Sequence, residues 1–171
     1  MAGALSCMTQ PDDGATTRIW DIIEKVGVCM LTTRAPRGLR ARPVEARPDR
    51  TSGLIWFVTD VRGTKDDEIE ANADVGLTFI HHADKAYLSI TGRAAVIEDH
   101  ARAAAIWANT DDVWWSGPND PNVRVLRVAP QLAELWDGPS STVVAAYEFA
   151  KARLTGAPPN LGENRKQTVR L

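Results

Sequence analysis

The chain has 171 residues, enough for one domain with a proper core and too few for two ordinary domains. An apolar content of 44% with 25% charged residues is that of a soluble globular protein, and a formal net charge of −2 gives no reason to expect nucleic acid or an anionic membrane as partner. Any anion-binding site must therefore be local.

The sequence shows no sign of export, of membrane insertion or of a metal centre. The segment ALSC (4–7) loosely resembles a lipoprotein cleavage box, but no basic residues precede it and few apolar residues surround it. No apolar run approaches the ~20 residues of a membrane span. Cys7 and Cys29 lack metal-ligand spacing, and His81 with His82 would need further ligands. We therefore expect a cytoplasmic protein without a signal peptide or a bound metal.

Helices and strands follow one another in a pattern that favours a single domain, which we place at residues 15–155. Residues 1–14 form a loose leader and residues 156–171 a polar tail in this interpretation. Thr16 or Thr17 is expected to cap the first helix. The predicted helices cover about 17–26, 65–73, 100–109 and 142–154, and the predicted strands are 27–33, 39–47, 54–59, 75–82, 86–99, 123–130 and 132–138.

Four strand residues carry structural information. Arg40 and Arg42 alternate with their neighbours, so they should share one face of their strand. Pro43 indicates that this strand is an edge or carries a bulge, and Gly92 predicts a bend in the long strand 86–99. Strands joined by hairpins, with helices inserted rather than alternating, predict a mainly β fold, an antiparallel β-barrel with α-helices.

A cationic turn follows the apolar strand, in the stretch TDVRGTKDDEIEAN (59–72). Backbone N–H groups at a helix start, a glycine, a hydroxyl and two cations are the parts of a phosphate site, although the spacing is not that of a nucleotide-binding P-loop. The alternative is structural, because the acids at 66–68 are ordinary partners of a helix dipole and could pair with Arg62 and Lys65. The local stretch leaves both interpretations open.

The order of several landmarks resembles the pyridoxamine 5′-phosphate oxidase-like family of flavin-binding split barrels, most closely its general stress protein branch. The resemblance covers roughly residues 16–155. Its pieces are Arg42-Pro43-Val44, LIWFVTD, Lys65 with DDEIEANADVGLTF, YLSITGRAAVIED, VWWSGPNDPNVRVLRVAP and AELWDGPSS. The resemblance implies an antiparallel Greek-key split barrel of the FMN-binding type, and a homodimer with FMN at the subunit interface.

The resemblance also implies which residues form the flavin site. Arg42 and Lys65 would hold the FMN phosphate, which suits a guanidinium fork beside an ammonium group. This sequence has Gly63 where related sequences tend to have serine, and Thr64 could supply the hydroxyl instead. The expected cofactor-binding residues are Arg42, Pro43, Val44, Val58, Thr59, Gly63, Thr64, Lys65 and Trp136.

Two functions agree with this reading. The first is an FMN-dependent oxidoreductase with NAD(P)H or a small molecule as its substrate, in which the flavin carries the redox chemistry and no catalytic side chain can be named. The second is a stress protein that binds or sequesters flavin without turnover. Oxidation of pyridoxamine phosphate itself is not expected, because WDGPSS (136–141) runs into a helix where that enzyme has an Arg/His-rich segment.

Three tryptophans have roles that the sequence can only partly assign. Trp114 and Trp115 lie in a polar loop, where core packing and pocket lining are equally good readings. Trp136 alternates with Leu132 and Glu134 on a strand face that carries a charge, so this face is not plain core. The resemblance implies that Trp136 contacts the flavin bound mainly by the other subunit.

Overall fold

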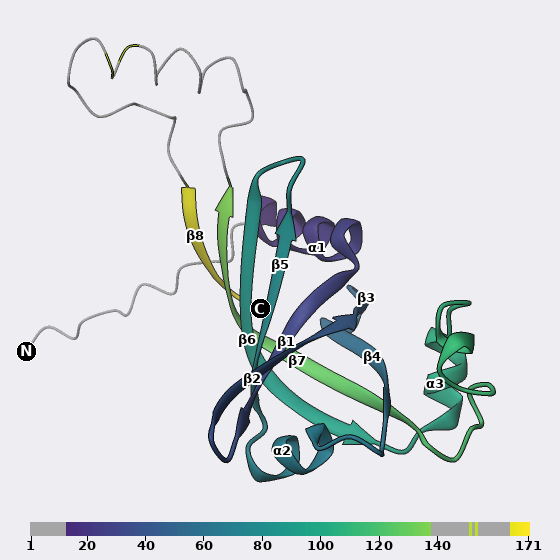
Figure 1. Cartoon of the computed structure of the whole chain (residues 1–171). Helices are drawn as coiled ribbons and strands as arrows, with labels where there is room; N and C mark the ends of the chain where they lie inside the picture. The colour runs from purple at the N-terminus through teal and green to yellow at the C-terminus, as the bar shows by residue number, and fades with distance from the viewer. Residues whose placement is uncertain (1–12, 138–150, 152, 154–164) are drawn as a thin grey trace, which may run out of the picture.

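The computed structural model describes residues 13–137, 151, 153 and 165–171, and β-strands dominate them. In chain order the elements are α1 (Asp13–Val26), β1 (Val28–Ala35), β2 (Gly38–Glu45), β3 (Arg47–Asp49), β4 (Leu54–Asp60), α2 (Lys65–Ala71), β5 (Asp74–His81), β6 (Ala86–Ile97), α3 (His100–Ile106), the 3-10 turn η1 (Asp111–Val113), β7 (Val123–Asp137) and β8 (Arg165–Arg170). The strands pair antiparallel in the order β2-β1-β5-β6-β7-β4-β3, with β8 on β7. The sheet coils into a split barrel, with α1 near one end, α2 near the other and α3 to one side (Figure 1). The predicted fold class is confirmed.

The sheet bends where β6 and β7 pass Gly92. The pairing register shifts at this point and leaves Gln131 as an extra residue on β7, next to Pro130, which has no N–H to donate. A Cβ atom at Gly92 would lie 2.5 Å from the carbonyl oxygen of Ala129, so the two backbones approach closely only because this residue is glycine. The predicted bend is confirmed.

The two strands predicted on either side of Gln131 form a single strand, β7, so that prediction was wrong. The bulge absorbs the extra residue without ending the β6–β7 ladder. The first half of β7 pairs with β4 and the last part pairs with β8. The long strand therefore belongs to both halves of the barrel.

The C-terminal residues 165–170 form β8, whereas the sequence predicted a polar tail there. Arg165–Arg170 pairs with residues 132–137 of β7, an edge that β4 does not reach because it ends its pairing at Val128. Val169 is buried in the main core. An otherwise unpaired strand edge and one buried valine explain why a segment of mostly polar residues joins the sheet.

The helix α1 covers one end of the barrel and supplies part of its core. Ile19, Ile22 and Ile23 are fully buried, which confirms the predicted apolar face. The helix begins at Asp13 rather than after a threonine cap, so the predicted cap was wrong. The helix is about one turn longer than predicted, and Ala15 in this first turn is buried in the same core.

Much of the predicted final helix, 142–154, lies outside the described residues, as do residues 1–12; Lys151 and Arg153, which are described, are helical. Among the described residues, no helix is long and apolar enough to cross a bilayer.

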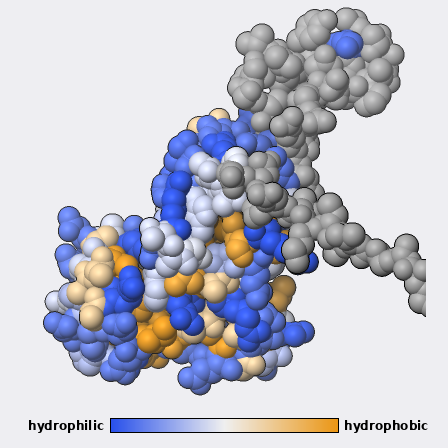
Figure 2. Space-filling view, turned by 180° about the vertical axis from the view of Figure 1, so that it is seen from behind, coloured by the Kyte–Doolittle hydropathy of each residue, from blue (hydrophilic) through white to orange (hydrophobic). Residues whose placement is uncertain are grey.

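Seen from behind, the surface is mostly hydrophilic, with apolar side chains exposed in several patches over the barrel (Figure 2).

Candidate functional site

Arg42 and Lys65 meet at a corner between β2 and the start of α2. Their side chains are only 21% and 12% exposed. Lys65 directs its Nζ toward the backbone oxygen of Asp60 at 3.5 Å. Burial lowers the pKa of Lys65, and the positive charge of Arg42 lowers it further, against the opposing effect of Asp66. Two cations at close quarters in a partly dry site favour an anion between them.

Arg42 keeps one donor atom unused at this corner. Its Nη2 donates to Thr33 Oγ1 at 3.0 Å and to a carboxylate oxygen of Glu68 at 2.6 Å. Its Nη1 is buried and has no hydrogen-bond partner among the described residues. A buried guanidinium N–H is rarely left without an acceptor, so this atom fits a site that is completed by a ligand oxygen.

Glu68 lies at the centre of the corner, with only 4% of its side chain exposed. Its carboxylate accepts from Thr33 Oγ1 at 2.6 Å and from Arg40 Nη1 at 3.0 Å, in addition to Arg42. The hydrogen bond from Thr33 and the contact with Arg42 hold the pKa of Glu68 below its usual range, although burial opposes them. Arg40 and Arg42 therefore share one strand face, as predicted.

The sequence did not identify Glu68 as part of the site, because it looked like any acid in a first helical turn. The sequence does contain a usable signal, which is the four-residue spacing of Thr64 and Glu68. This spacing places both residues on one side of α2, and in the structure both contact Arg40. The suggested pairing of the helix acids with Arg62 is not what the structure shows. Arg62 pairs with Asp60 instead, whereas the suggested pairing with Lys65 is present, with Asp66 Oδ1 3.8 Å from Lys65 Nζ.

The other predicted site residues lie around the corner on different faces. On β2, Pro43 is exposed and Val44 packs partly against the main core. On β4, Thr59 is buried just before the cationic turn, while Val58 faces the opposite way, into the second core cluster under α3. Gly63 and Thr64 form the turn itself and are exposed. Thr64 Oγ1 accepts from Arg40 Nη1 at 2.7 Å.

Trp136 does not lie at the corner of its own chain. Arg42 pairs with Leu31, and the same row of paired residues crosses β5 and β6 to reach Ala133 of β7. Four strand spacings separate the two ends of this row, roughly 19 Å when followed along the curved sheet. Trp136 is three residues beyond Ala133, so its side chain emerges from the opposite face of the sheet, where it is half-buried.

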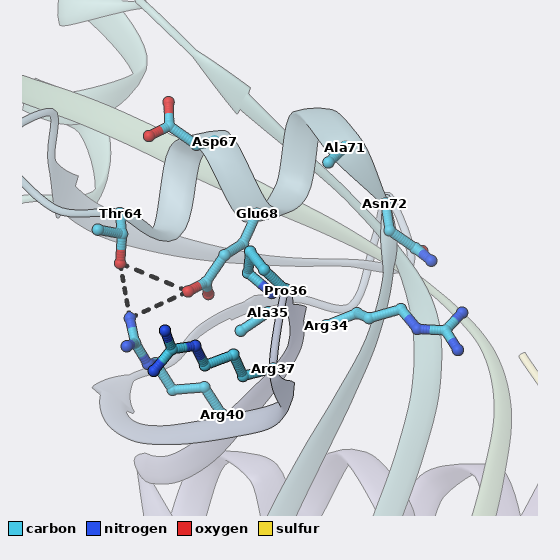
Figure 3. Close-up of a pocket in the computed structure, with 10 residues that line it drawn as sticks. All are labelled: Arg34, Ala35, Pro36, Arg37, Arg40, Thr64, Asp67, Glu68, Ala71 and Asn72. Atoms are coloured by element: carbon cyan, nitrogen blue, oxygen red, sulfur yellow. Dashed lines mark hydrogen bonds and ion pairs between the residues drawn. The ribbon is translucent and has the colours of Figure 1, made fainter.

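A cleft of about 780 Å³ opens beside the corner, between the β1–β2 hairpin and α2. Figure 3 shows its lining, with α2 on one side and arginines of the hairpin on the other. The residues that line it are Arg34, Ala35, Pro36, Arg37, Arg40, Thr64, Asp67, Glu68, Ala71 and Asn72. Thr64 and Glu68 belong to both the cleft and the corner.

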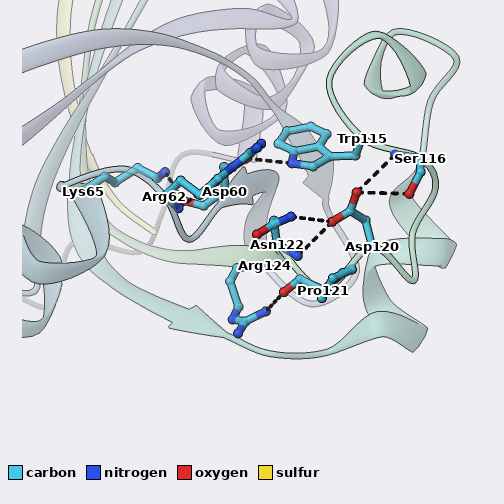
Figure 4. A network of polar contacts seen from close by, with 9 residues as sticks. All are labelled: Asp60, Arg62, Lys65, Trp115, Ser116, Asp120, Pro121, Asn122 and Arg124. Atoms are coloured by element: carbon cyan, nitrogen blue, oxygen red, sulfur yellow. Dashed lines mark hydrogen bonds and ion pairs between the residues drawn. The ribbon is translucent and has the colours of Figure 1, made fainter.

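The tryptophan loop between α3 and β7 is fixed to the cationic turn through Asp60. Trp115 Nε1 donates to Asp60 Oδ2 at 3.0 Å, and Arg62 pairs with the same carboxylate (Figure 4). The hydrogen bonds from Arg62 hold the pKa of Asp60 well below its usual range. Trp115 also packs edge-on against Trp107, with ring centroids 6.1 Å apart, whereas Trp114 is 72% exposed. The two adjacent tryptophans therefore differ: Trp115 packs, and Trp114 projects into solvent.

The fold and the site together define the class of protein: a split antiparallel barrel with a partly buried arginine and lysine at one corner. Within that class, the chain belongs to the pyridoxamine 5′-phosphate oxidase-like family, whose model matches residues 14–160. It is 24% identical to protein bli-3 of Neurospora crassa over 152 residues, 80% of this chain and 71% of that protein. It is 26% identical to general stress protein 26 of Bacillus subtilis over 94 residues, 53% of this chain and 67% of that protein.

Two solved structures extend the similarity. General stress protein 26 from Jannaschia sp. CCS1 is 26% identical, with a TM-score of 0.73 over 92% of this chain and 99% of that one. The general stress FMN/FAD binding protein of Xanthomonas citri is 25% identical, with a TM-score of 0.65 over 72% of this chain and 89% of that one.

Proposed function

We propose that the chain binds FMN with the ribityl phosphate at the corner formed by Arg42 and Lys65. The observation that carries this proposal is the buried Nη1 of Arg42, which has no hydrogen-bond partner among the described residues and lies beside an ammonium group whose burial favours neutralisation by an anion. A phosphate dianion supplies both the acceptor and the charge. The similarity to a general stress FMN/FAD binding protein supports the same cofactor class.

Each residue of the corner has a distinct part in this proposal. Arg42 offers its free N–H to a phosphate oxygen, and Lys65 offers a point charge. Glu68 and Thr33 hold the Arg42 guanidinium in place, so that binding need not first order this side chain. FMN, when bound, supplies reversible two-electron redox chemistry, and the protein binds, orients and shields it.

We propose that the flavin-loaded protein is an oxidoreductase of unknown substrate, with NAD(P)H or a small molecule as its reaction partner. The alternative is a stress protein that binds flavin without turnover, and the similarity to general stress proteins favours this alternative equally. Anaerobic addition of NADH or NADPH to the flavin-loaded protein separates the two. Rapid loss of the yellow absorbance is expected for an enzyme, and no loss with any physiological donor for a binding protein.

The binding proposal is tested by titrating apoprotein with FMN and with riboflavin, which lacks the phosphate. Arg42→Ala and Lys65→Ala should each weaken FMN binding by about 1.5–3 kcal/mol, the usual contribution of a hydrogen bond to a charged group. Riboflavin should bind both variants about as well as it binds the parent. Arg93→Ala is the matched control, because Arg93 is exposed and its ion pair is with exposed Asp74 on the surface. Unchanged FMN affinity in both corner variants would refute the phosphate assignment.

We also propose a homodimer with FMN at the subunit interface. The outer face of the sheet carries exposed apolar side chains on three neighbouring strands: Val28 and Met30 on β1, Ile80 on β5 and Tyr87 on β6. Strand pairing places Ile80 opposite Tyr87 and Tyr87 opposite Trp136, so the same face continues onto β7. An apolar sheet face of this kind suits an isologous interface with a second copy of the chain.

A further inference from the structure

We propose that a groove between β3 and α3 binds a small organic carboxylate, at a site centred on Trp56 and Arg102. The groove has a volume of about 670 Å³, which is within the range of small-molecule sites. The described residues that line it include none that belong to the corner of Arg42 and Lys65 or to the cleft beside that corner. The groove is therefore separate from the proposed phosphate site, and the inference does not depend on the proposed function.

The first observation is an indole N–H without an acceptor. Trp56 lines the groove and is only 7% exposed, on the face of β4 that packs under α3. Its Nε1 is buried and has no hydrogen-bond partner among the described residues. A buried tryptophan usually finds an acceptor for this group, because an unpaired N–H away from water costs free energy. A ligand oxygen would supply the missing acceptor.

The second observation is an arginine directly over the same ring. The guanidinium carbon of Arg102, on α3, lies 4.5 Å from the centroid of the Trp56 ring. The backbone N–H of Arg102 donates to Asp99, but its guanidinium forms no hydrogen bond or ion pair within the part of the chain that the structure describes. A long side chain without polar partners can turn aside, so that a carboxylate reaches the indole N–H and pairs with the guanidinium.

The charge of the groove favours a ligand with one negative charge. The other charged residues that line it have polar partners, in the pairs Arg47–Glu45, Arg47–Asp111, Arg50–Glu24 and Asp49 with the backbone N–H of Ser52. Among the described lining residues, Arg102 therefore supplies the positive charge that is left for a ligand. A phosphate dianion would also face the carboxylates of Glu24 and Asp49, whereas a carboxylate matches a single guanidinium in charge and in its two-oxygen geometry.

The rest of the groove suits an apolar body on the ligand. Pro48 of β3 lines it on one side, and Ala105, Ile106 and Trp107 at the end of α3 line it on the other. Arg47 Nε donates to the backbone oxygen of Ile106 at 3.2 Å, and this hydrogen bond ties the two walls together. An aromatic or branched apolar group can therefore fill the space beside the carboxylate without first ordering the walls.

The test uses benzoate as the probe and follows the indole N–H resonances of the isotope-labelled protein by NMR, with and without FMN. Benzoate should move one indole resonance downfield in a saturable manner, because this N–H gains an acceptor, and Trp56→Phe should lack that resonance. Arg102→Ala should weaken benzoate binding at least about tenfold, the effect of losing one charge-assisted contact. Arg102 is partly exposed, so this variant should fold. Arg37→Ala, at an exposed position in the β1–β2 hairpin, removes the same charge away from the groove and should leave the benzoate affinity unchanged.

Two further probes separate the carboxylate from its parts. Benzyl alcohol lacks the charge and inorganic phosphate lacks the apolar body, so both should bind much more weakly than benzoate. Equal affinity for benzyl alcohol, tighter binding of phosphate or an unmoved Trp56 resonance would overturn the proposal, as would unchanged benzoate affinity in Arg102→Ala. Displacement of benzoate by FMN would also overturn it, because the groove would then belong to the flavin site.

Discussion

At the scale of single residues, Glu68 determines how the corner behaves. It is a buried acid that binds the arginine proposed to hold phosphate, and so it places a negative charge next to a site for a dianion. Through the hydrogen bonds from Thr33 and Arg42 it also fixes the guanidinium. The same residue therefore stabilises the arrangement of the corner and weakens the positive field that would attract a phosphate.

Replacing Glu68 with glutamine separates these two effects. Glu68→Gln keeps the size and an acceptor oxygen but removes the charge, so FMN affinity should rise by about tenfold, while riboflavin affinity stays the same. The free energy of unfolding should fall by about 1–3 kcal/mol, because charged hydrogen bonds are lost. Glu70→Gln, an exposed position on the same helix, should change neither quantity. Weaker FMN binding by Glu68→Gln would contradict this prediction. It would mean that Glu68 helps binding more by positioning Arg42 than it opposes binding by repelling the phosphate.

The loss of stability in Glu68→Gln should depend on pH. The pKa of Glu68 is lower in the folded protein than its usual value, so its contribution is present at neutral pH and is lost as the pH falls through the lower, folded-state value. The stability difference between the parent and Glu68→Gln should therefore narrow in acid. Urea unfolding at a series of pH values measures this difference.

At the scale of elements, the sequence predicted most strands because their apolar residues alternate or form short runs. It failed where long-range pairing overrides the local pattern. Pro130 and Gln131 look like a break between strands, yet the ladder with β6 continues past them. β8 is mostly polar, and only the free edge of β7 and the buried site of Val169 explain it. In the site, strand alternation placed Arg40 with Arg42, but the spacing of Thr64 and Glu68 became meaningful once α2 was seen to pack beside these arginines.

The β6–β7 bulge should depend on Gly92. A Cβ atom there would meet backbone atoms of Ala129 and Pro130 at 2.5 and 3.1 Å, and backbone cannot rotate away as a side chain can. Gly92→Ala should therefore lower the free energy of unfolding by about 1–3 kcal/mol. Gly76→Ala in β5 is the control, because its nearest neighbour would be the Thr32 Cβ at 3.7 Å, an ordinary contact. Equal stability of the two variants in urea unfolding would show that the bulge tolerates a side chain.

At the scale of the whole molecule, the residues predicted to bind flavin lie on two faces of the sheet, so the proposed shared site would need two chains. Arg42 lies on the same sheet face as Ala133, and Trp136 lies on the opposite face. No side-chain rotation brings Trp136 to the corner of its own chain across four strands. If Trp136 contacts the flavin, the phosphate of that flavin must be held by a second copy. The exposed apolar face around Tyr87 is the surface on which we propose that this copy docks.

Trp136 therefore tests the dimer and the shared site in one experiment. Close approach of its indole to the flavin should quench the flavin emission, so Trp136→Phe should lower FMN affinity modestly and restore part of the emission, and Trp136→Ala should cost more affinity. Trp107→Phe is the control, since Trp107 packs on Trp115 beside α3. The parent should sediment as a dimer at micromolar concentration, with an interface on the order of 1,200–2,000 Å² or larger. Unchanged flavin binding in Trp136→Ala, with a stability loss of about 3–5 kcal/mol, would assign the indole to packing within one chain. A monomer in sedimentation would remove the shared site altogether, because one chain alone cannot bring Trp136 to Arg42.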